Sequence, residues 1–425
     1  LTSKLGFGER VASVTTVGTP NHGTSMGDIA LGLVPSKAAV AVDKLLSYVS
    51  CSTSGFQQIT RKYHEETFSK ECADVPGVGY FSATSAIANP VFRSALPMFW
   101  IPHRVLLGTE GDNDGFVSVE SAKWGRHICT YAGDHYGQIG QFLGRSRGLD
   151  HVKFFDEIVT TLESVLGRNP DHPGACHYYL HAIEASLQPE LALPCAERLP
   201  HLMPGAGHLV HMPAHIYMRM GKYHEAAEQN QQAAHVDEQY LADQHPAGEY
   251  ADGYYTHNLH FLWASLAMEG RNVDALKVAR DLTATITEEE ARKDRGKELY
   301  LPTPIFSMIR FGRWDELLKE PVPPKGLRLM EGMWRLGRGL ALVATGRLPG
   351  AEGEHVVLAG LTKQIRRHRA TEEKTERALL KIAERVLAGE IAARRQHYDD
   401  AVRLFEEAIT IEEGLPYSEP PLWPL

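Results

Sequence analysis

The sequence is poor in cysteine, in long apolar runs and in clustered positive charge, and each shortage excludes a class of protein. Five irregularly spaced cysteines among 425 residues cannot form a disulfide framework. A Cys51–Cys72 bridge and a pair of unbridged thiols both stay open. No apolar run approaches the roughly 18 residues that a membrane-spanning helix needs. The net charge of -9 and the lack of a long basic segment argue against a nucleic-acid partner.

The chain has the composition of a globular protein and the length for two or three domains. Hydrophobic residues make up 43% of it and charged residues 23%. Strand-type runs occur only in the first third, whereas every long apolar pattern after about residue 150 has helix spacing. A helical pattern over residues 154–166 leads into a turn signal at 167–170. We therefore predict an α/β domain over residues 1–160 and an all-α domain over 161–425.

An acid and a histidine stand out in the first domain. Asp114 and His135 each follow an apolar, β-branched run, at residues 104–108 and 127–131, that predicts a strand. An α/β-hydrolase sheet presents two members of its catalytic triad in this way, on loops after successive strands. The histidine acts as general base, and the carboxylate fixes its tautomer and stabilises the imidazolium. This pattern predicts a triad-derived role for Asp114 and His135.

The surrounding sequence resembles the bacterial triacylglycerol lipases. Residues 11–23 (VASVTTVGTPNHG) resemble the strand and loop that follow the nucleophile elbow of that family. Residues 113–119 (NDGFVSV) resemble its acid loop, and Asp134-His135 resembles its histidine loop. The resemblance covers about residues 1 to 160. It implies a partial α/β-hydrolase sheet and a lipase-like serine ester hydrolase acting on lipid or other esters.

The resemblance also assigns roles. It makes Asp114 the acid and His135 the base, with Asp112 and Asp134 as the nearest rival acids. In the family, a His-Ser-x-Gly-Gly elbow lies a few residues before the segment that resembles the one starting at Leu1. We expect this sequence to be cut from a longer protein at both ends. Without the elbow serine, we expect no esterase turnover from the chain as given.

Two further motif matches, one to a nucleophile elbow and one to a calcium site, are only partial. Residues 23–27 match G-x-S-x-G around Ser25, but a loop at 18–23 separates this serine from the preceding strand. The nucleophile elbow needs a serine directly off a strand, so we interpret Ser25 as part of a loop and helix cap. Gln141 matches a position near the calcium site of the lipases. Gly137 stands where that site has an aspartate ligand, so we do not expect calcium.

The second domain contains an internal repeat. A turn residue is followed two positions later by a residue that is usually bulky, and five positions later by a small or aliphatic one. This pattern begins at Gly221, Gly270, Gly312, Gly346 and Gln396, with spacings of 49, 42, 34 and 50 residues. It resembles the tetratricopeptide repeat and implies an irregular helical solenoid, whose stability comes from stacking between neighbours.

Histidines recur at helical spacing in the first part of this domain. Residues three or four apart share a helix face, and two imidazoles on one turn suit a divalent zinc, copper or iron ion. Three such pairs lie within ninety residues: His177 and His181, His211 and His215, and His257 and His260. His208 lies three before His211. The alternative is that these imidazoles are core residues hydrogen-bonded to backbone and to neighbouring Glu184 or tyrosines.

Two stretches that contain these histidines resemble a group of bacterial tetratricopeptide-like proteins. They are residues 172–186 and residues 204–215. This resemblance supports the helical fold rather than any chemistry.

Three functions compete. We predict a nucleophile-less lipase-like fragment joined to a tetratricopeptide-like solenoid, which acts as a binding or scaffold module for a peptide or protein. The first alternative is an active lipase or carboxylic ester hydrolase whose elbow serine lies upstream of residue 1. The second is a metal-dependent activity in the histidine-lined groove. The compartment, and whether the two halves form a natural fusion, stay open.

Overall fold

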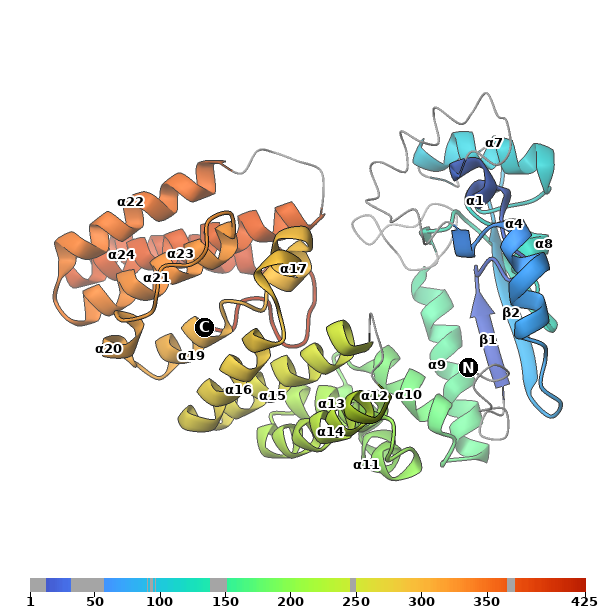
Figure 1. Cartoon of the computed structure of the whole chain (residues 1–425), viewed down its shortest axis with the longest axis horizontal. Coiled ribbons are helices and arrows are strands. Elements are labelled where there is room, and N and C mark those ends of the chain that lie inside the picture. Colours follow the sequence, from blue (N-terminus) through green and yellow to red (C-terminus); the bar gives the residue numbers. More distant parts are fainter. Residues whose placement is uncertain are drawn as a thin grey trace. The chain divides into compact units, whose positions relative to one another are not determined.

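The chain folds into two compact units, Leu1–Thr160 and Thr161–Leu425, in a computed structural model (Figure 1). The structure describes residues 13–31, 57–89, 91, 95, 97–137, 151–244, 250–364 and 371–425. Within these ranges, no helix is both long and apolar enough to cross a membrane.

A small parallel sheet organises the first unit. Its strands run in the order β1 (Ser13–Val17), β2 (Gly79–Ala86) and β3 (Arg126–Ala132). The central strand is the most buried, and Ser82, Thr84 and Ser85 on it are almost inaccessible to solvent. Since parallel strands end at the same edge of a sheet, the residues that follow β2 and β3 come together there.

The described part of this unit also contains helices and short helical turns, joined by loops. They are α1 (Ser25–Ala30), α4 (Arg61–Tyr63), the π-helical turn η2 (His64–Phe68), α5 (Ser69–Glu71), the 3-10 turn η3 (Pro97–Phe99), α7 (Trp100–Thr109), α8 (Val119–Ala122) and α9 (His151–Arg168). A buried cluster of Met26, Ile29 and Leu106 joins α1 to α7. Residue 160, where the first unit ends, lies inside α9.

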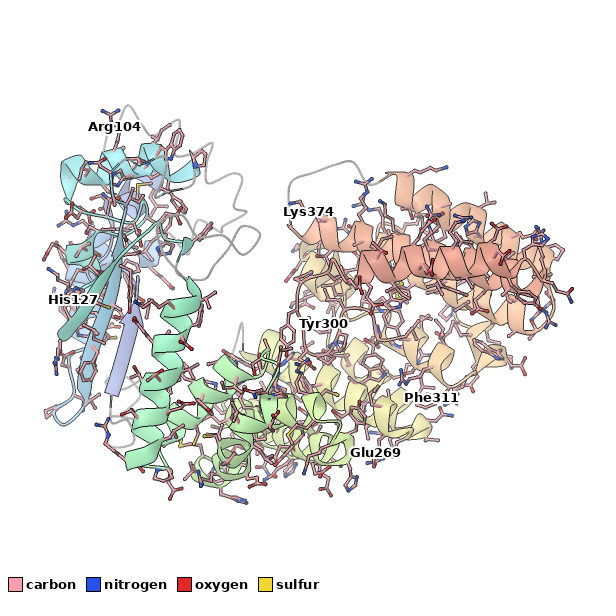
Figure 2. All side chains as sticks on the ribbon, turned by 180° about the vertical axis from the view of Figure 1, so that it is seen from behind. Arg104, His127, Glu269, Tyr300, Phe311 and Lys374 are labelled. Carbon is pink, nitrogen blue, oxygen red and sulfur yellow. The ribbon has the colours of Figure 1, made fainter. Side chains whose placement is uncertain are left out.

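One strand prediction was wrong. Residues 104–108 belong to helix α7, on which Figure 2 labels Arg104. A short apolar run cannot by itself distinguish a strand from one face of a helix. Here the buried side chains are Pro102, His103 and Leu106, whose spacing of one and three residues is that of a helix.

The prediction of a strand at residues 127–131 is confirmed by β3. The strand that leads toward Asp114 in the sheet is β2, which the sequence analysis did not identify. Its sequence, GYFSATSA, is rich in small polar residues. Ser and Thr on a fully covered central strand give no hydrophobic alternation, so the usual strand signal is missing.

In its described residues, the second unit contains helices and no strands. The helices are α10 (Pro173–Ile183), α11 (Leu193–Leu202), α12 (Gly207–His211), α13 (Pro213–Arg219), α14 (Tyr223–Gln244), α15 (Thr256–Glu269), α16 (Asn272–Ala284), α17 (Glu288–Lys293), α18 (Arg295–Glu298), α19 (Thr303–Arg310), α20 (Trp314–Leu317), α21 (Arg328–Ala344), α22 (Leu348–Gln364), α23 (Thr371–Arg394) and α24 (Tyr398–Glu412). Two shorter turns are η5 (Pro189–Ala192) and η6 (Tyr250–Tyr255). Helices that follow one another in sequence pack together, as α14 with α15 and α23 with α24 (Figure 1).

All five predicted turns of the repeat are helix C-terminal turns. Gly221, Gly270, Gly312, Gly346 and Gln396 have positive φ, between 64° and 84°. In each, the next N–H donates to the carbonyl five residues back, as Lys222 does to Tyr217, which is the Schellman arrangement.

The next helix begins two residues after each of these turns. The residue five after each turn is buried: Ala226, Ala275, Leu317, Ala351 and Ala401. The repeat pattern therefore marks where helices end, where they begin and where they touch.

Candidate functional site

Asp114 is a buried carboxylate whose two oxygens are both occupied. It lies next to the end of β2, because the backbone N–H of Ile87, the residue after that strand, donates to the Asn113 carbonyl at 2.8 Å. The backbone N–H groups of residues 116 and 117 donate to Asp114 Oδ1 at 2.9 and 2.7 Å. Oδ2 accepts from Ser85 Oγ at 3.2 Å and lies 2.8 Å from His135 Nδ1. With 1% exposure, the carboxylate is fixed in one orientation.

His135 follows β3 and is held over the same edge of the sheet. Its backbone N–H donates to the Asp114 carbonyl at 2.9 Å. Because Nδ1–H of the ring donates its hydrogen bond to the Asp114 carboxylate, Nε2 of the neutral ring carries a lone pair. Burial disfavours the charged ring, but the hydrogen bond to Asp114 and the charges of Asp114 and Asp134 raise the pKa of His135 above its ordinary value.

Asp114, and not a rival, is the acid in contact with the imidazole. Asp134 directs Oδ1 to the backbone N–H of Gly137 at 2.8 Å. Asp112 contributes its backbone carbonyl to the N–H of Val119. Ser85 was not predicted, because no sequence motif marks it and only the packing of β2 against this loop brings it to Asp114.

Ser25 begins helix α1 after a loop, as interpreted from the sequence. Its backbone N–H donates to Glu110 Oε1 at 2.6 Å, and Thr24 supplies the side-chain cap of the helix. Among the described cysteines, none forms a disulfide with Cys72. Cys51 and Gln141 lie outside the described residues, so the bridge and the calcium position are untested.

A first histidine triad joins α10 and α12. His177 Nε2 lies 3.0 Å from His181 Nε2 and 3.1 Å from His208 Nε2. One imidazole nitrogen offers either one proton or one lone pair, so His177 Nε2 cannot make an ordinary hydrogen bond to both. Zn–N bonds of about 2.0–2.1 Å would set tetrahedral ligand nitrogens roughly 3.4 Å apart. The spacing of these nitrogens is therefore close to that of a metal site.

A second triad joins α12, α13 and α15. It consists of His211, His215 and His257, whose ligand atoms lie within 4.8 Å of one another. His211 Nε2 and His215 Nε2 are 2.9 Å apart. His211 and His215 are buried, whereas His257 is partly exposed. Either triad could hold a metal ion.

The partners of the second triad orient its nitrogens. His211 Nδ1 lies 2.6 Å from Asn230 Oδ1, while Asn230 Nδ2 donates to the Ala226 carbonyl at 2.8 Å. This second bond identifies the oxygen of the Asn230 amide, so His211 carries its proton on Nδ1. His215 Nδ1 lies 2.9 Å from Glu184 Oε2, although the pair is not aligned as a hydrogen bond. The carboxylate still favours a proton on that nitrogen.

Two lone pairs consequently face each other in the second triad. With the protons on Nδ1, Nε2 of His211 and Nε2 of His215 both present electron density across 2.9 Å. That contact is repulsive unless a proton on one of the two nitrogens, or a metal cation, lies between them. Burial, followed by the neighbouring imidazoles, lowers the pKa of His211 well below its usual value, which disfavours a proton there. A metal ion is the partner that this arrangement fits.

Other rings of the two triads are also held neutral. Burial, and then the neighbouring imidazoles, lowers the pKa of His177 to about 3, that of His208 to about 4 and that of His257 to about 3. Neutral imidazole is the form that binds metal. The site is thus set for ligation at neutral pH.

Two assignments of single histidines differ from the sequence prediction. His260 belongs to neither triad: its ring stacks on Trp263 at 5.3 Å and meets Tyr300, labelled in Figure 2, edge-on at 5.1 Å. Residues three apart differ by about 60° around a helix, which separates His260 from His257. His208 takes a ligand position instead. It shares α12 with His211, but the two rings belong to different triads.

The two triads adjoin. The rings of His208 and His211 lie 6.2 Å apart, and those of His181 and His215 lie 6.5 Å apart. The Glu184 carboxylate acts electrostatically on His181 as well as contacting His215. The triads therefore form one histidine-rich region with a carboxylate next to both.

Comparison with known proteins gives no family for this chain. No family model matches it, and no curated protein matches it. Its function has to be inferred from the two sites just described.

Proposed function

We propose that the helical unit binds divalent transition-metal ions through its two histidine triads, and that these metal sites are the working part of the chain. The first site uses His177, His181 and His208, and the second uses His211, His215 and His257. The observation that carries the proposal is the 2.9 Å separation of the His211 and His215 Nε2 atoms, whose Nδ1 atoms face Asn230 and Glu184. Partners of this kind orient ligating histidines in metal proteins.

The donor set limits the metal. Imidazole nitrogen suits zinc, copper, iron and nickel, whereas calcium takes oxygen ligands. Three protein ligands leave at least one coordination position for water or a substrate, as in catalytic zinc sites. We therefore infer a metal centre that can act as a Lewis acid, and zinc, copper and iron are the first metals to test.

The test is metal stoichiometry on the untagged chain. After removal of metal with a chelator and reloading with zinc, elemental analysis is expected to give about two equivalents, one for each three-ligand site. The double variants His177→Ala/His181→Ala and His211→Ala/His215→Ala should each lose about one equivalent. His235→Ala, an exposed histidine on α14, is the matched control and should lose none.

The proposal has a clear negative result. Binding to the folded state stabilises it by about 2.7 kcal/mol when the metal concentration is a hundred times Kd. Less than about a tenth of an equivalent of any of these metals, together with no thermal shift on adding them, would mean that the histidines are core residues.

A second candidate function concerns the first unit. We propose that Asp114 and His135 are the acid and base of an ester hydrolase similar to the bacterial triacylglycerol lipases. This rests on the 2.8 Å contact between Oδ2 and Nδ1 and on the fully occupied Asp114 carboxylate. A nucleophilic serine within reach of the His135 ring would complete the triad.

The same proposal predicts that the present chain lacks serine-type turnover. Short acyl p-nitrophenyl esters should not be hydrolysed, because the oxyanion hole also depends on the backbone N–H that follows the nucleophile. Fluorophosphonate labelling at Ser25, with activity lost in Ser25→Ala, would overturn this prediction.

The tetratricopeptide-like repeat is better explained as the scaffold that positions the metal ligands than as the source of a separate activity. Its five helix-ending turns position successive helices, α12, α13 and α15 among them. Within the described residues, no observation favours a peptide or protein ligand over a metal. The scaffold role stays a prediction.

A further inference from the structure

A cavity lies next to the second triad, inside the helical unit. Its volume is about 400 Å³, and His257 forms part of its wall. His260 and Tyr300 line it as well, together with Phe306 and Glu419. His257 is therefore shared between the triad and the cavity.

The C-terminal segment closes one side of this cavity. Residues 418–422 and Pro424 contribute to its wall. The segment is fastened to α19: Trp423 is 6% exposed and its ring lies 6.0 Å from that of Phe306, while Arg310 donates to the Pro424 carbonyl at 3.1 Å. The wall that the C-terminal segment contributes is thus packed structure, while the cavity as a whole is partly open to solvent.

Buried side chains pack against the rings of the triad. Phe261, which is fully buried, lies 5.1 Å from the His211 ring and 4.6 Å from the His215 ring, centroid to centroid. Asn230 occupies the outer edge of His211. His257 is the most exposed member of the triad and, of its three histidines, the one that lines the cavity, so the cavity meets the triad at His257.

The cavity has a mainly apolar body and a polar end near the triad. Leu299, Phe306 and three prolines contribute apolar wall. Glu419 lies at the polar end and interacts electrostatically with His215. Its Oε2 is buried and has no hydrogen-bond partner among the described residues. A buried acceptor without a donor is costly, and a ligand that brings an N–H or O–H would satisfy it.

The charges around the cavity argue against a strongly anionic ligand. Asp294 and Glu419 both line it. The one lysine in the wall, Lys297, is already paired with Glu290 Oε1 at 3.0 Å. Away from the metal, a phosphate ester in the body of the cavity would be repelled by these two carboxylates.

We propose that this cavity is the substrate pocket of the second triad. It takes a small, uncharged or weakly acidic carbonyl compound, of the amide, ester or hydroxamate class, whose oxygen binds the metal and whose apolar body fills the cavity. Glu419 accepts the N–H or O–H of that head group. The inference rests on metal binding at His211, His215 and His257.

The test uses the full chain loaded with cobalt(II), in a His177→Ala/His181→Ala background that leaves only the second triad. Cobalt absorbs in the visible range and reports on its ligands. Azide probes the open coordination position alone, whereas benzohydroxamate probes the position and the cavity together. Both are expected to change the cobalt spectrum.

Filling the cavity should separate the two probes. Leu299→Trp is expected to weaken benzohydroxamate at least about tenfold and to leave azide within about twofold, because only the larger ligand needs the space. Ser418→Trp on the opposite wall gives the same readout if the first variant fails to fold. Val273→Trp adds the same ring at a position that is 74% exposed and should change neither.

The outcomes distinguish the two proposals. Cobalt that binds but responds to neither probe, or benzohydroxamate binding that is equal in Leu299→Trp, Ser418→Trp and Val273→Trp, contradicts the pocket while metal binding stands. Absence of cobalt binding contradicts the metal site itself. Glu419→Gln adds a further check: benzohydroxamate should weaken while azide binding persists, since the amide is a poorer acceptor than the carboxylate.

Discussion

His211 and Asn230 are joined by a 2.6 Å contact between Nδ1 and Oδ1, and both side chains are fully buried. The Asn230 amide is itself fixed, because its Nδ2 donates within α14 to the Ala226 carbonyl. The pair therefore decides which nitrogen of His211 is left with a lone pair. Asn230 would not itself bind the metal, but it fixes the tautomer of His211, which would.

Asn230→Leu should weaken zinc binding at the second triad by about 10- to 100-fold, the usual cost of losing such a partner. The leucine keeps the size but removes the acceptor, so His211 is free to adopt either tautomer. Competition with a chelating dye measures the affinity. Asn230→Asp retains the acceptor and should bind as wild type does; equal affinity in the leucine variant would remove Asn230 from the site.

His257→Phe and His260→Phe form a matched pair on one helix. His257→Phe should abolish the second site and leave about one equivalent of zinc, since two histidines alone hold the ion poorly. His260→Phe keeps an aromatic ring against Trp263 and Tyr300 and should leave about two equivalents, because His260 lies in neither triad. Elemental analysis distinguishes them. The reverse result would show that the triads are assigned wrongly.

The pKa of His135 should lie above the ordinary value of about 6.5, and Asp114→Asn should lower it. Selective labelling of histidine and an NMR titration of the ring give both values. Because the folded pKa is raised, the stabilisation from this pair is fully present below the unfolded pKa and is lost as pH rises through the folded pKa. Asp112→Asn is the control and should leave the titration in place. An unchanged His135 pKa in Asp114→Asn would contradict the assignment of the acid.

Gln396→Gly should stabilise the helical unit by about 1 kcal/mol. Gln396 has a φ of 68°, a left-handed conformation that costs residues with a Cβ and costs glycine little. Gly346→Ala is the reciprocal change at an equivalent turn, where no atom lies within 4 Å of the added Cβ, and should destabilise by a similar amount. The midpoints of urea unfolding measure both. Shifts of the same sign would show that contacts other than the turn decide the effect.

The two strand predictions show how far local sequence reaches. Residues 127–131 were predicted correctly because the run HICTY is rich in apolar and β-branched residues, which favour a strand, although Ile128 on it is exposed. Residues 104–108 were not, because a short apolar run fits a helix equally well. Strand β2 carries Ser and Thr on a covered strand, and its place between β1 and β3 follows from pairing with segments that lie far away in the chain.

The sequence by itself determined the features that depend on neighbours along the chain. The five turns could be predicted because a glycine or its substitute must end each helix in a left-handed conformation. The histidine pairs His177 with His181 and His211 with His215 could be predicted because residues four apart share a helix face. Tertiary structure alone decided which pairs meet. It gave His208 to the first triad and His257 to the second, placed Tyr300 against His260, and brought Asn230 to His211 and Ser85 to Asp114. These contacts depend on how separate helices and strands pack, and packing is fixed by the shape of whole surfaces rather than by spacing along the chain.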